Sequence, residues 1–276
     1  MLTALSIENR QGKNAFARLF NLVRGNSAYA SINSARGVAL RHVHYINRTG
    51  KVDWNRLGRI IDSGRKGILC SDEVVFPEDS GFTRFENGEF KSRLCVNLGL
   101  FVENRLGGRV PLAFYDPRGE NTALIKDVVS CCGDVTVVTD NLTLYNERCE
   151  ELTGELGASV HCSENRALLG NCPLVLAPTR INGLLPLSDE AVVLTSAPPT
   201  VCVHGFVYFD YSFRMPNFFD RIKPDDLSEE YFAGALYSKA YQRELGSIVP
   251  TSCSNLTSSQ TASSIEKYLL RKNAVV

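Results

Sequence analysis

The sequence predicts an α/β protein organised around a parallel sheet. Between residues 110 and 209, short apolar segments alternate with segments of helical periodicity, and two of the apolar segments end in a carboxylate. Continuous apolar, β-branched strands that alternate with helices are typical of a parallel sheet covered on both faces. The composition is 44% hydrophobic and 22% charged, as in globular proteins, and a chain of 276 residues can bury a substantial core.

The strands expected in this region share an apolar character and cover residues 110–116, 134–140, 159–163, 172–177, 191–195 and 201–209. The last of them is either a further parallel strand or an antiparallel edge. Helices are expected at 122–132 and 142–156, where apolar residues return at helical spacing. This order of elements is the plan of a Rossmann-like domain.

The first third of the chain predicts a smaller α/β unit. A strand is expected at 38–46, where apolar residues alternate with polar ones, and a second, short strand at 67–70. Asp53 is expected to cap a helix that begins at residue 54. A helix is also expected at 14–24, and its apolar residues fall on one face: Phe16, Leu19, Phe20 and Val23.

The helix expected at 90–106 ends at Gly107-Gly108, which is a helix stop and a candidate hinge. We therefore expect a smaller α/β domain at 1–108 and a Rossmann-like domain with C-terminal helices at 109–276, with a crevice between them. In the C-terminal part, the pattern predicts a helix at 228–245, a Ser- and Thr-rich loop at 251–264 and a short helix at 265–272.

Charge and cysteine content narrow the function classes. Thirty basic residues balance thirty acidic ones, which gives no electrostatic basis for a nucleic-acid or anionic-membrane partner. No apolar run approaches the ~20 residues that span a bilayer, and the N-terminus lacks the order of a signal peptide, so a cytoplasmic protein is expected. The nine cysteines include no C-x-x-C pair and are interpreted as reduced, buried thiols. No metal site is expected, because ligands at recognisable spacings are missing.

Polar residues follow three of the expected strands. In an open parallel sheet, ligands bind beyond the carboxyl ends of the strands, where the strand order reverses. The candidates for binding a small-molecule ligand are the polar and turn residues of these loops: Asp116, Arg118, Gly119, Asn121, Asp140, Asn141, Thr179, Arg180 and Asn182.

Four of these candidates have a simpler interpretation. Asp116 precedes a Pro-Arg-Gly turn, where an aspartate caps backbone N–H groups. Asp140 and Asn141 stand directly before a helix, in the position of an N-cap. Arg180 either holds a carboxylate or phosphate in the crevice or is a solvated loop arginine.

At these loops the chain resembles a known family. The order of elements over residues 110–209 resembles the nucleotide-binding domain of the shikimate dehydrogenase and glutamyl-tRNA reductase type of NAD(P) enzyme. Asp140 stands where such domains place a ribose-binding acid, about 20 residues after the first loop. Leu176-Ala177-Pro178-Thr179 resembles their loop along the cofactor, after the fourth strand. The resemblance implies NAD or NADP as a cofactor.

The first loop departs from the pattern of that family. A dinucleotide site needs glycines there so that the backbone can approach the pyrophosphate. This chain has a single glycine and two carboxylates in Asp116-Pro117-Arg118-Gly119-Glu120-Asn121. The carboxylates repel a diphosphate and Pro117 lacks an N–H donor, although Arg118 offsets one charge. A Rossmann-like scaffold without a dinucleotide site is therefore an open alternative.

Histidines supply the candidates for chemistry, since there is no G-x-S-x-G motif. His204, just before Gly205 in an apolar run, is the candidate acid–base residue, and the alternative is a core histidine bonded to backbone. His42 and His44 point to the same side of a strand, a spacing that suits a metal or an anion. No third ligand is evident, so the alternative is a pair of partly exposed strand histidines.

These observations leave three hypotheses. The first is a protein that binds a small anionic metabolite or a nucleotide in the crevice, with no implied catalysis. The second is an NAD(P)-dependent oxidoreductase with an atypical phosphate loop, in which Asp140 holds the adenine ribose and residues 177–180 flank the nicotinamide. The third is a structural or assembly protein whose aromatic segment, residues 206–219, forms the surface of a homodimer.

Overall fold

A computed structural model describes residues 1–12, 14–108, 110–132, 135–156 and 160–273. The chain divides into two compact units. The first contains Met1–Asn87 and Met215–Leu245, and the second contains Gly88–Arg214 and Gly246–Val276.

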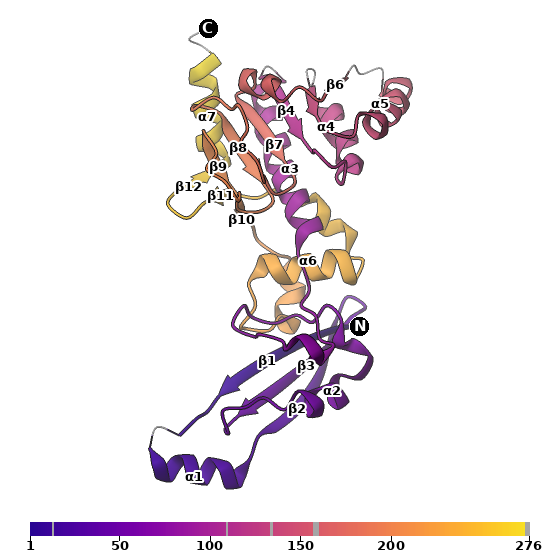
Figure 1. The fold of residues 1–276 in the computed structure, drawn as a ribbon. Helices are drawn as coiled ribbons and strands as arrows, with labels where there is room; N and C mark the ends of the chain where they lie inside the picture. Colours follow the sequence, from indigo (N-terminus) through magenta and orange to yellow (C-terminus); the bar gives the residue numbers. More distant parts are fainter. Residues whose placement is uncertain (13, 109, 133–134, 157–159, 274–276) are drawn as a thin grey trace. The chain divides into compact units, whose positions relative to one another are not determined.

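The first unit is built on a three-stranded mixed sheet in the order β1-β3-β2 (Figure 1). β1 (Leu2–Asn9) runs parallel to β3 (Val38–Asn47), and β2 (Ser27–Ala35) runs antiparallel to it. α1 (Ala15–Arg24) connects β1 to β2, and α2 (Trp54–Ile61) follows β3. β1 and β2 were not expected from the sequence, whereas the predictions of β3, α1 and α2 are confirmed.

The core of the first unit lies between one face of this sheet and α2. The Asp53 carboxylate accepts the Arg56 N–H at 2.9 Å and caps α2, as predicted. The core residues come from the strands, α2 and the following loops: Leu5, Val43, Tyr45, Leu57, Ile61, Ile68, Cys70, Val74 and Phe82. The strand expected at 67–70 is wrong in extent, because Ile68 and Leu69 form isolated bridges with Arg84 and Ala4 instead of a ladder. The later segment contributes α6 (Glu229–Lys239), shorter than the helix expected at 228–245.

The second unit contains a six-stranded sheet in which every neighbouring pair is parallel. In spatial order the strands are β6 (Val160–Ser163), β5 (Val135–Val138), β4 (Leu112–Tyr115), β7 (Leu174–Ala177), β8 (Val192–Thr195) and β9 (Phe206–Tyr208). After β4 the chain adds β5 and β6 on one side of β4, and it then adds β7, β8 and β9 on the other side. The strand order therefore reverses between β4 and β7. This is the strand order of a Rossmann-like sheet. The predicted α/β fold with a Rossmann-like parallel sheet is confirmed, and β9 is parallel.

Helices cover one face of this sheet. α3 (Gly88–Leu106) packs on β7 and β8, and α4 (Ile125–Cys131) packs beside α3. Gly99 of α3 lies so close to Leu176 of β7 that a methyl group in its place would overlap the leucine. α5 (Leu142–Leu156) approaches the same face, because its Tyr145 ring lies 6.4 Å from Phe114, the register partner of Leu176.

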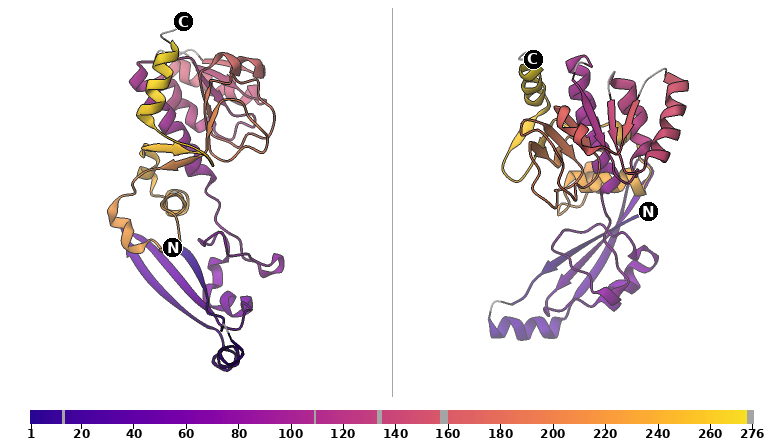
Figure 2. Two further views of the ribbon diagram at one scale, coloured as in Figure 1. Left: turned by 90° about the vertical axis from the view of Figure 1, so that its left-hand side faces the viewer. Right: turned by 45° about the horizontal axis from the view of Figure 1, so that its top comes forward.

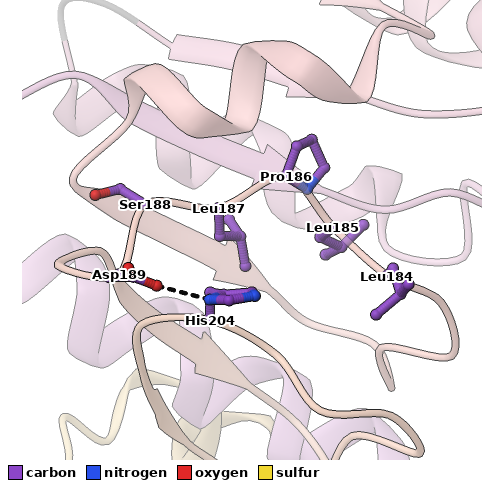
Figure 3. Close-up of a pocket in the computed structure, with 7 residues that line it drawn as sticks. All are labelled: Leu184, Leu185, Pro186, Leu187, Ser188, Asp189 and His204. Carbon is purple, nitrogen blue, oxygen red and sulfur yellow. Dashed lines mark hydrogen bonds and ion pairs between the residues drawn. The ribbon is translucent and has the colours of Figure 1, made fainter.

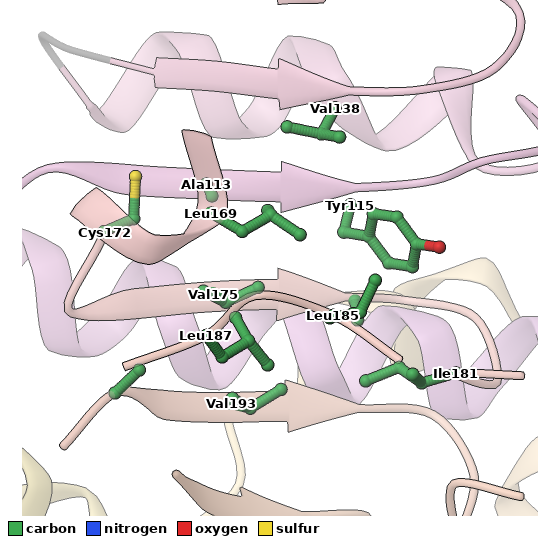
Figure 4. Packing of buried hydrophobic residues seen from close by; sticks show 12 residues of the cluster. Ala113, Tyr115, Val138, Leu169, Cys172, Val175, Ile181, Leu185, Leu187 and Val193 are labelled. Atoms are coloured by element: carbon green, nitrogen blue, oxygen red, sulfur yellow. The ribbon is translucent and has the colours of Figure 1, made fainter. Parts of the chain in front are cut away.

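Apolar side chains from the chain connections pack on the opposite face (Figure 4). The connection from β6 to β7 contains only the 3-10 helix η4 (Arg166–Asn171), and the segment 178–191 that connects β7 to β8 is irregular. Apolar side chains of these connections pack on the sheet: Leu169, Cys172, Ile181, Leu185, Leu187 and Ala191. This face of the core therefore depends on loop packing.

A small antiparallel sheet and a C-terminal helix complete the second unit. β10 (Asp210–Ser212), β11 (Ser252–Ser254) and β12 (Ser259–Thr261) pair in that order, and α7 (Ala262–Asn273) follows. The expected loop at 251–264 is therefore wrong in part, because the Ser- and Thr-rich backbone is paired across β11 and β12. Short 3-10 helices complete the chain: η1 (Asp62–Arg65), η2 (Glu78–Ser80), η3 (Thr122–Leu124), η5 (Asn217–Ile222) and η6 (Arg243–Ser247).

The aromatic segment 206–219 is largely buried. Four of its rings are buried in their own units: Tyr208, Phe209, Tyr211 and Phe219. The Tyr211 hydroxyl donates to the Thr195 carbonyl at 2.8 Å, and Phe206, which is partly exposed, packs against Tyr268. The buried rings contribute to the cores of their units, and a homodimer surface in this segment stays a prediction.

Among the described residues, no helix combines the length and the apolar character needed to cross a membrane.

Candidate functional site

The candidate ligand-binding residues lie on loops at one edge of the six-stranded sheet. Asp116 directly follows β4, Asp140 comes two residues after β5, and Thr179 and Arg180 come shortly after β7. Because β4, β5 and β7 are parallel and adjacent, these loops leave the same, carboxyl edge of the sheet. The edge between β4 and β7 is the point at which the strand order reverses, and ligands of such sheets bind there. The individual residues' roles in binding stay a prediction.

Asp116 is fully buried and closes the first loop. Its Oδ2 accepts the Asn121 N–H at 2.7 Å and the Tyr145 hydroxyl at 2.7 Å. The Gly119 N–H donates to the Asp116 carbonyl at 3.2 Å, with Gly119 at a φ of +74° that glycine adopts without strain. Burial, and next the charge of Asp116, raise the pKa of Tyr145, so its hydroxyl stays a donor. The prediction that Asp116 caps turn N–H groups is confirmed.

This arrangement changes what the first loop can bind. In a dinucleotide site, the backbone N–H groups of this loop face a pyrophosphate. Here the Asn121 N–H donates to the Asp116 carboxylate, so a backbone donor that could bind a pyrophosphate is already bonded to an acidic side chain. The remaining exposed cation of the loop, Arg118, lies 3.5 Å from Glu120. The loop therefore offers little positive potential to a diphosphate.

Asp140 forms an ion pair that was not predicted. Its two oxygens accept hydrogen bonds from Arg166 Nη2 at 3.1 and 2.9 Å. Both side chains remain about half exposed, and the hydrogen bond with Asp140 raises the pKa of Arg166. Asn141, whose Oδ1 accepts the Leu144 N–H at 3.5 Å, takes the place of the helix cap, which leaves Asp140 free for this pair.

Arg166 was missed because 26 residues separate it from Asp140 along the chain. It begins η4, which Asn165 caps by accepting the Ala167 N–H at 3.1 Å. The sequence did contain one indication of Arg166. It follows the strand expected at 159–163, and residues that follow a strand of a parallel sheet lie at the carboxyl edge.

Hydrogen bonds hold the loop after β7 in place, and its one arginine, Arg180, is exposed to solvent. The Thr179 carbonyl accepts the Thr195 hydroxyl at 2.7 Å, and the Asn182 side chain accepts the Thr200 hydroxyl at 3.3 Å. Arg180 lies between these anchors, is exposed, and has no hydrogen-bond or ion-pair partner within the part of the chain that the structure describes. A guanidinium held out from a fixed loop is suited to a carboxylate or phosphate.

His204 lies at the opposite edge of the sheet. It precedes β9, and the Phe206 N–H donates to the Ala191 carbonyl just before β8, so this is the amino edge. Its Nδ1 lies 2.6 Å from the Asp189 carboxylate, and its side chain is 66% exposed. The alternative of a core histidine is therefore wrong, and His204 is not brought together with the residues of the carboxyl edge.

The His204–Asp189 pair borders a cavity of about 670 Å³ formed mainly by the connection between β7 and β8 (Figure 3). Three of its seven lining residues are leucines, and Ser188 points away from the imidazole (Figure 3). The pair therefore has an oriented imidazole but no nucleophile beside it.

His42 and His44 form a polar cluster in the first unit. Their ring centroids lie 3.8 Å apart with the rings tilted by 39°, and His42 Nε2 lies 2.7 Å from the Ser6 hydroxyl, which donates to Asp226 at 2.8 Å. Burial, and next the charge of His44, lower the pKa of His42. Within the described residues, no group of three or more His, Cys, Asp or Glu side chains is arranged to hold a metal ion.

The nine cysteines are free thiols, and six of them are buried. Burial raises the pKa of Cys95 to about 12, so this thiol is not a nucleophile at neutral pH. Cys131 and Cys202 are exposed, which departs from the expectation of buried thiols.

Comparisons with known proteins do not identify a family. No family model matches the chain, and no curated protein matches it. Among solved structures, an L-tryptophan dehydrogenase from Nostoc punctiforme is similar at 15% sequence identity and a TM-score of 0.33, covering 100% of this chain and 83% of that chain. A likeness this low carries no argument about function.

Proposed function

We propose that this chain binds a small anionic metabolite or a nucleotide at the carboxyl edge of the six-stranded sheet. The observation that supports this proposal most is the strand order, which reverses between β4 and β7 and marks this edge as the ligand position. Arg180 is the anion-binding group, because it follows β7 at that reversal and has no partner within the described chain.

The charges at this edge favour a compact anion over a dinucleotide. Asp116 supplies a buried negative charge to the first loop, and its hydrogen bond with Asn121 takes up a donor that a pyrophosphate would need. Two like charges 4 Å apart repel by about 4 kcal/mol at the effective dielectric near a protein surface. A carboxylate or single phosphate held by Arg180 avoids the first loop altogether.

An alternative is an NAD(P)-dependent oxidoreductase. The Asp140–Arg166 pair supports it, because an acid after the second strand binds a ribose and a nearby arginine accommodates the 2′-phosphate of NADP. In this alternative the Arg166 side chain breaks its ion pair with Asp140 and binds the 2′-phosphate instead. The first loop must also open to admit the pyrophosphate.

The two functions are separated by a thermal-shift titration of the purified chain. The probes are NADH, NADPH, ATP, and a panel of carboxylates and sugar phosphates. A ligand at a hundred times its dissociation constant adds about 2.7 kcal/mol of stability, which moves the midpoint by several degrees. We expect a carboxylate or sugar phosphate to give such a shift.

Matched variants assign the shift to residues. Arg180→Gln is expected to abolish it, while Arg118→Gln retains it, because Arg118 is an equally exposed arginine of the same edge that is already paired with Glu120. A shift with NADPH that disappears in Arg166→Gln would instead favour the oxidoreductase. No shift with any probe, or a shift that Arg180→Gln leaves intact, would contradict the proposed site.

A further inference from the structure

α1 of the first unit presents its apolar face to solvent. The four side chains of the stripe predicted from the sequence are 60–84% exposed: Phe16, Leu19, Phe20 and Val23. Their spacing is that of a helix that packs on a core. The polar side is instead bonded to the preceding chain, with Arg18 Nε donating to the Gly12 carbonyl at 3.2 Å and Asn21 Nδ2 to the Arg10 carbonyl at 2.8 Å. These bonds fix α1 with its apolar side outward.

The strand that follows α1 is an open sheet edge. β2 pairs only with β3 among the described strands, so its outer edge has unpaired backbone groups. Between Ser27 and Ala35 there is no charged residue and no proline, the features with which edge strands usually resist pairing. Tyr29 and Ile32 are 56% and 63% exposed. Arg36, the residue after β2, lies over the ring of Phe218 in η5, so η5 lies next to the far end of the strand.

α1 and the outer edge of β2 are adjacent, and we call them together the α1–β2 surface. Tyr29 and Ile32 flank this edge on opposite faces of the sheet, because three positions separate them. Figures 1 and 2 show α1 beyond the ends of the three strands, joined directly to β2. Seven of the large exposed hydrophobic residues of the chain lie between residues 16 and 32: Phe16, Leu19, Phe20, Leu22, Val23, Tyr29 and Ile32. With aromatic side chains of about 200 Å² and aliphatic ones of about 100 Å², each roughly two-thirds exposed, they present about 600 Å² of apolar area.

We propose that a second copy of this chain covers the α1–β2 surface. Its β2 pairs antiparallel with β2 of the first copy across a two-fold axis, and each α1 packs its apolar face against the partner. An antiparallel pairing of identical edges satisfies the backbone groups of both strands and is self-complementary, as a two-fold interface requires. Centred on Ser31, it sets Tyr29 opposite Asn33 and Ile32 opposite Ala30, so that large side chains meet small ones.

The area supports this occupant. A stable interface buries about 800 Å² on each partner, of which the apolar side chains supply about 600 Å² and the paired strand edge adds the remainder. A lipid surface would also accept an apolar helix that carries arginines and no acid, as α1 does. Lipid cannot satisfy the unpaired N–H and C=O groups of β2, whereas a second β2 can.

Sedimentation equilibrium of the full chain tests the proposal. Over about 1–100 µM, we expect a species of twice the 30.5 kDa chain mass. Two independent variants are expected to weaken association at least tenfold, about 1.4 kcal/mol. Phe20→Ser removes an anchor of the helix face, and Ala30→Lys places a charge on the strand edge. Circular dichroism checks that both variants remain folded.

Val75→Ser is the matched control, because Val75 is a 79% exposed apolar residue of the same unit outside the surface. It should leave the dimer unchanged. A wild-type chain that stays monomeric at the highest concentration would overturn the proposal, and so would a dimer that neither Phe20→Ser nor Ala30→Lys weakens. Flotation of a monomeric wild-type chain with phosphatidylserine vesicles would reassign the helix face to lipid.

Discussion

At the scale of single residues, the carboxyl edge is organised by how each charge is paired. Asp116 is buried and takes two donors, Asp140 is half exposed and takes one arginine, and Arg180 is left to solvent. The hydrogen bonds of Asp116 are therefore structural in the first place. The hydrogen bonds of Asp140 can exchange with a ligand, and the Arg180 guanidinium is exposed and can accept one directly.

The first prediction concerns the donor to Asp116. Tyr145→Phe removes the hydroxyl that donates to this buried carboxylate at 2.7 Å, and we expect a loss of about 1.5–3 kcal/mol of unfolding free energy, as for hydrogen bonds to charged groups. Urea unfolding followed by fluorescence measures it. Tyr115→Phe is the control, since its hydroxyl has no hydrogen-bond partner within the described chain. Equal stability of the two variants would show that the Tyr145 hydroxyl contributes nothing.

The second prediction is a pH dependence at Glu103 of α3. Burial raises the pKa of this carboxyl, although the Val110 N–H, 3.2 Å from its Oε1, opposes the rise. A carboxyl whose folded pKa exceeds its unfolded value of about 4.3 stabilises the fold at low pH, and this contribution is lost as the pH rises through the folded pKa. Glu103→Gln keeps the acceptor and removes the charge.

We therefore expect Glu103→Gln to be more stable than the wild-type chain at pH 8, with a difference that shrinks towards pH 5. Urea unfolding at both pH values measures it. A stability difference that does not change with pH would show that ionisation of Glu103 has no part in it.

At the scale of elements, the sequence was most informative where one periodic pattern dominates. α5 and α1 appear within a residue of their expected bounds, because their apolar residues repeat at helical spacing. β2, with its alanines, serines and one asparagine, has no such pattern, and its pairing with β3 decides its structure. The stripe of α1 predicted the helix correctly, but a stripe alone does not show whether the core or another molecule covers it.

The third prediction tests the packing of α3 on the sheet. Gly99→Ala places a methyl group against Leu176, and we expect a loss of about 1–3 kcal/mol, typical of overpacking. Gly154→Ala in α5 is the matched control, because nothing lies within 4 Å of its added methyl group. That control should gain about 0.5–1 kcal/mol from helix propensity. Chemical unfolding compares them, and a gain from both substitutions would mean that α3 does not pack this closely.

At the scale of the whole molecule, the chain leaves the first unit at Asn87 and returns to it at Met215. α3 belongs to the second unit because it packs on β7 and β8, although it precedes the expected boundary after residue 108. The predicted domain boundaries, 1–108 and 109–276, stay a prediction, as does the crevice between the domains. Local sequence patterns cannot show that residues 215–245 rejoin the first unit, because the contacts join segments that are far apart in sequence.

The candidate site shows the same limit. The position of the loops at the carboxyl edge could be predicted from the strand pattern, because parallel strands end at the same edge of a sheet. The role of Arg166 could not be predicted in this way, because its partner Asp140 is distant in sequence. His204 lies at the amino edge because it precedes β9. Whether a residue comes before or after its strand was visible in the sequence and decides which edge it occupies.

The fourth prediction tests whether the two chain segments of the first unit form one cooperative structure. Gly234 of α6 contacts the side chain of Asn87, whose Nδ2 donates to the Glu230 carbonyl at 3.1 Å. In Gly234→Ala the added methyl group overlaps the Asn87 amide and displaces it. We expect faster amide exchange in both 1–87 and 215–245, because residues that open together lose protection together.

Hydrogen–deuterium exchange with mass spectrometry measures this change in the full chain. Peptides of the six-stranded sheet should keep their exchange rates, and Gly99→Ala, which disturbs the second unit, should show the reverse distribution. Faster exchange confined to 229–239 would contradict the prediction. It would mean that α6 is attached to the first unit without sharing its stability, so that the first 87 residues hold their sheet together alone.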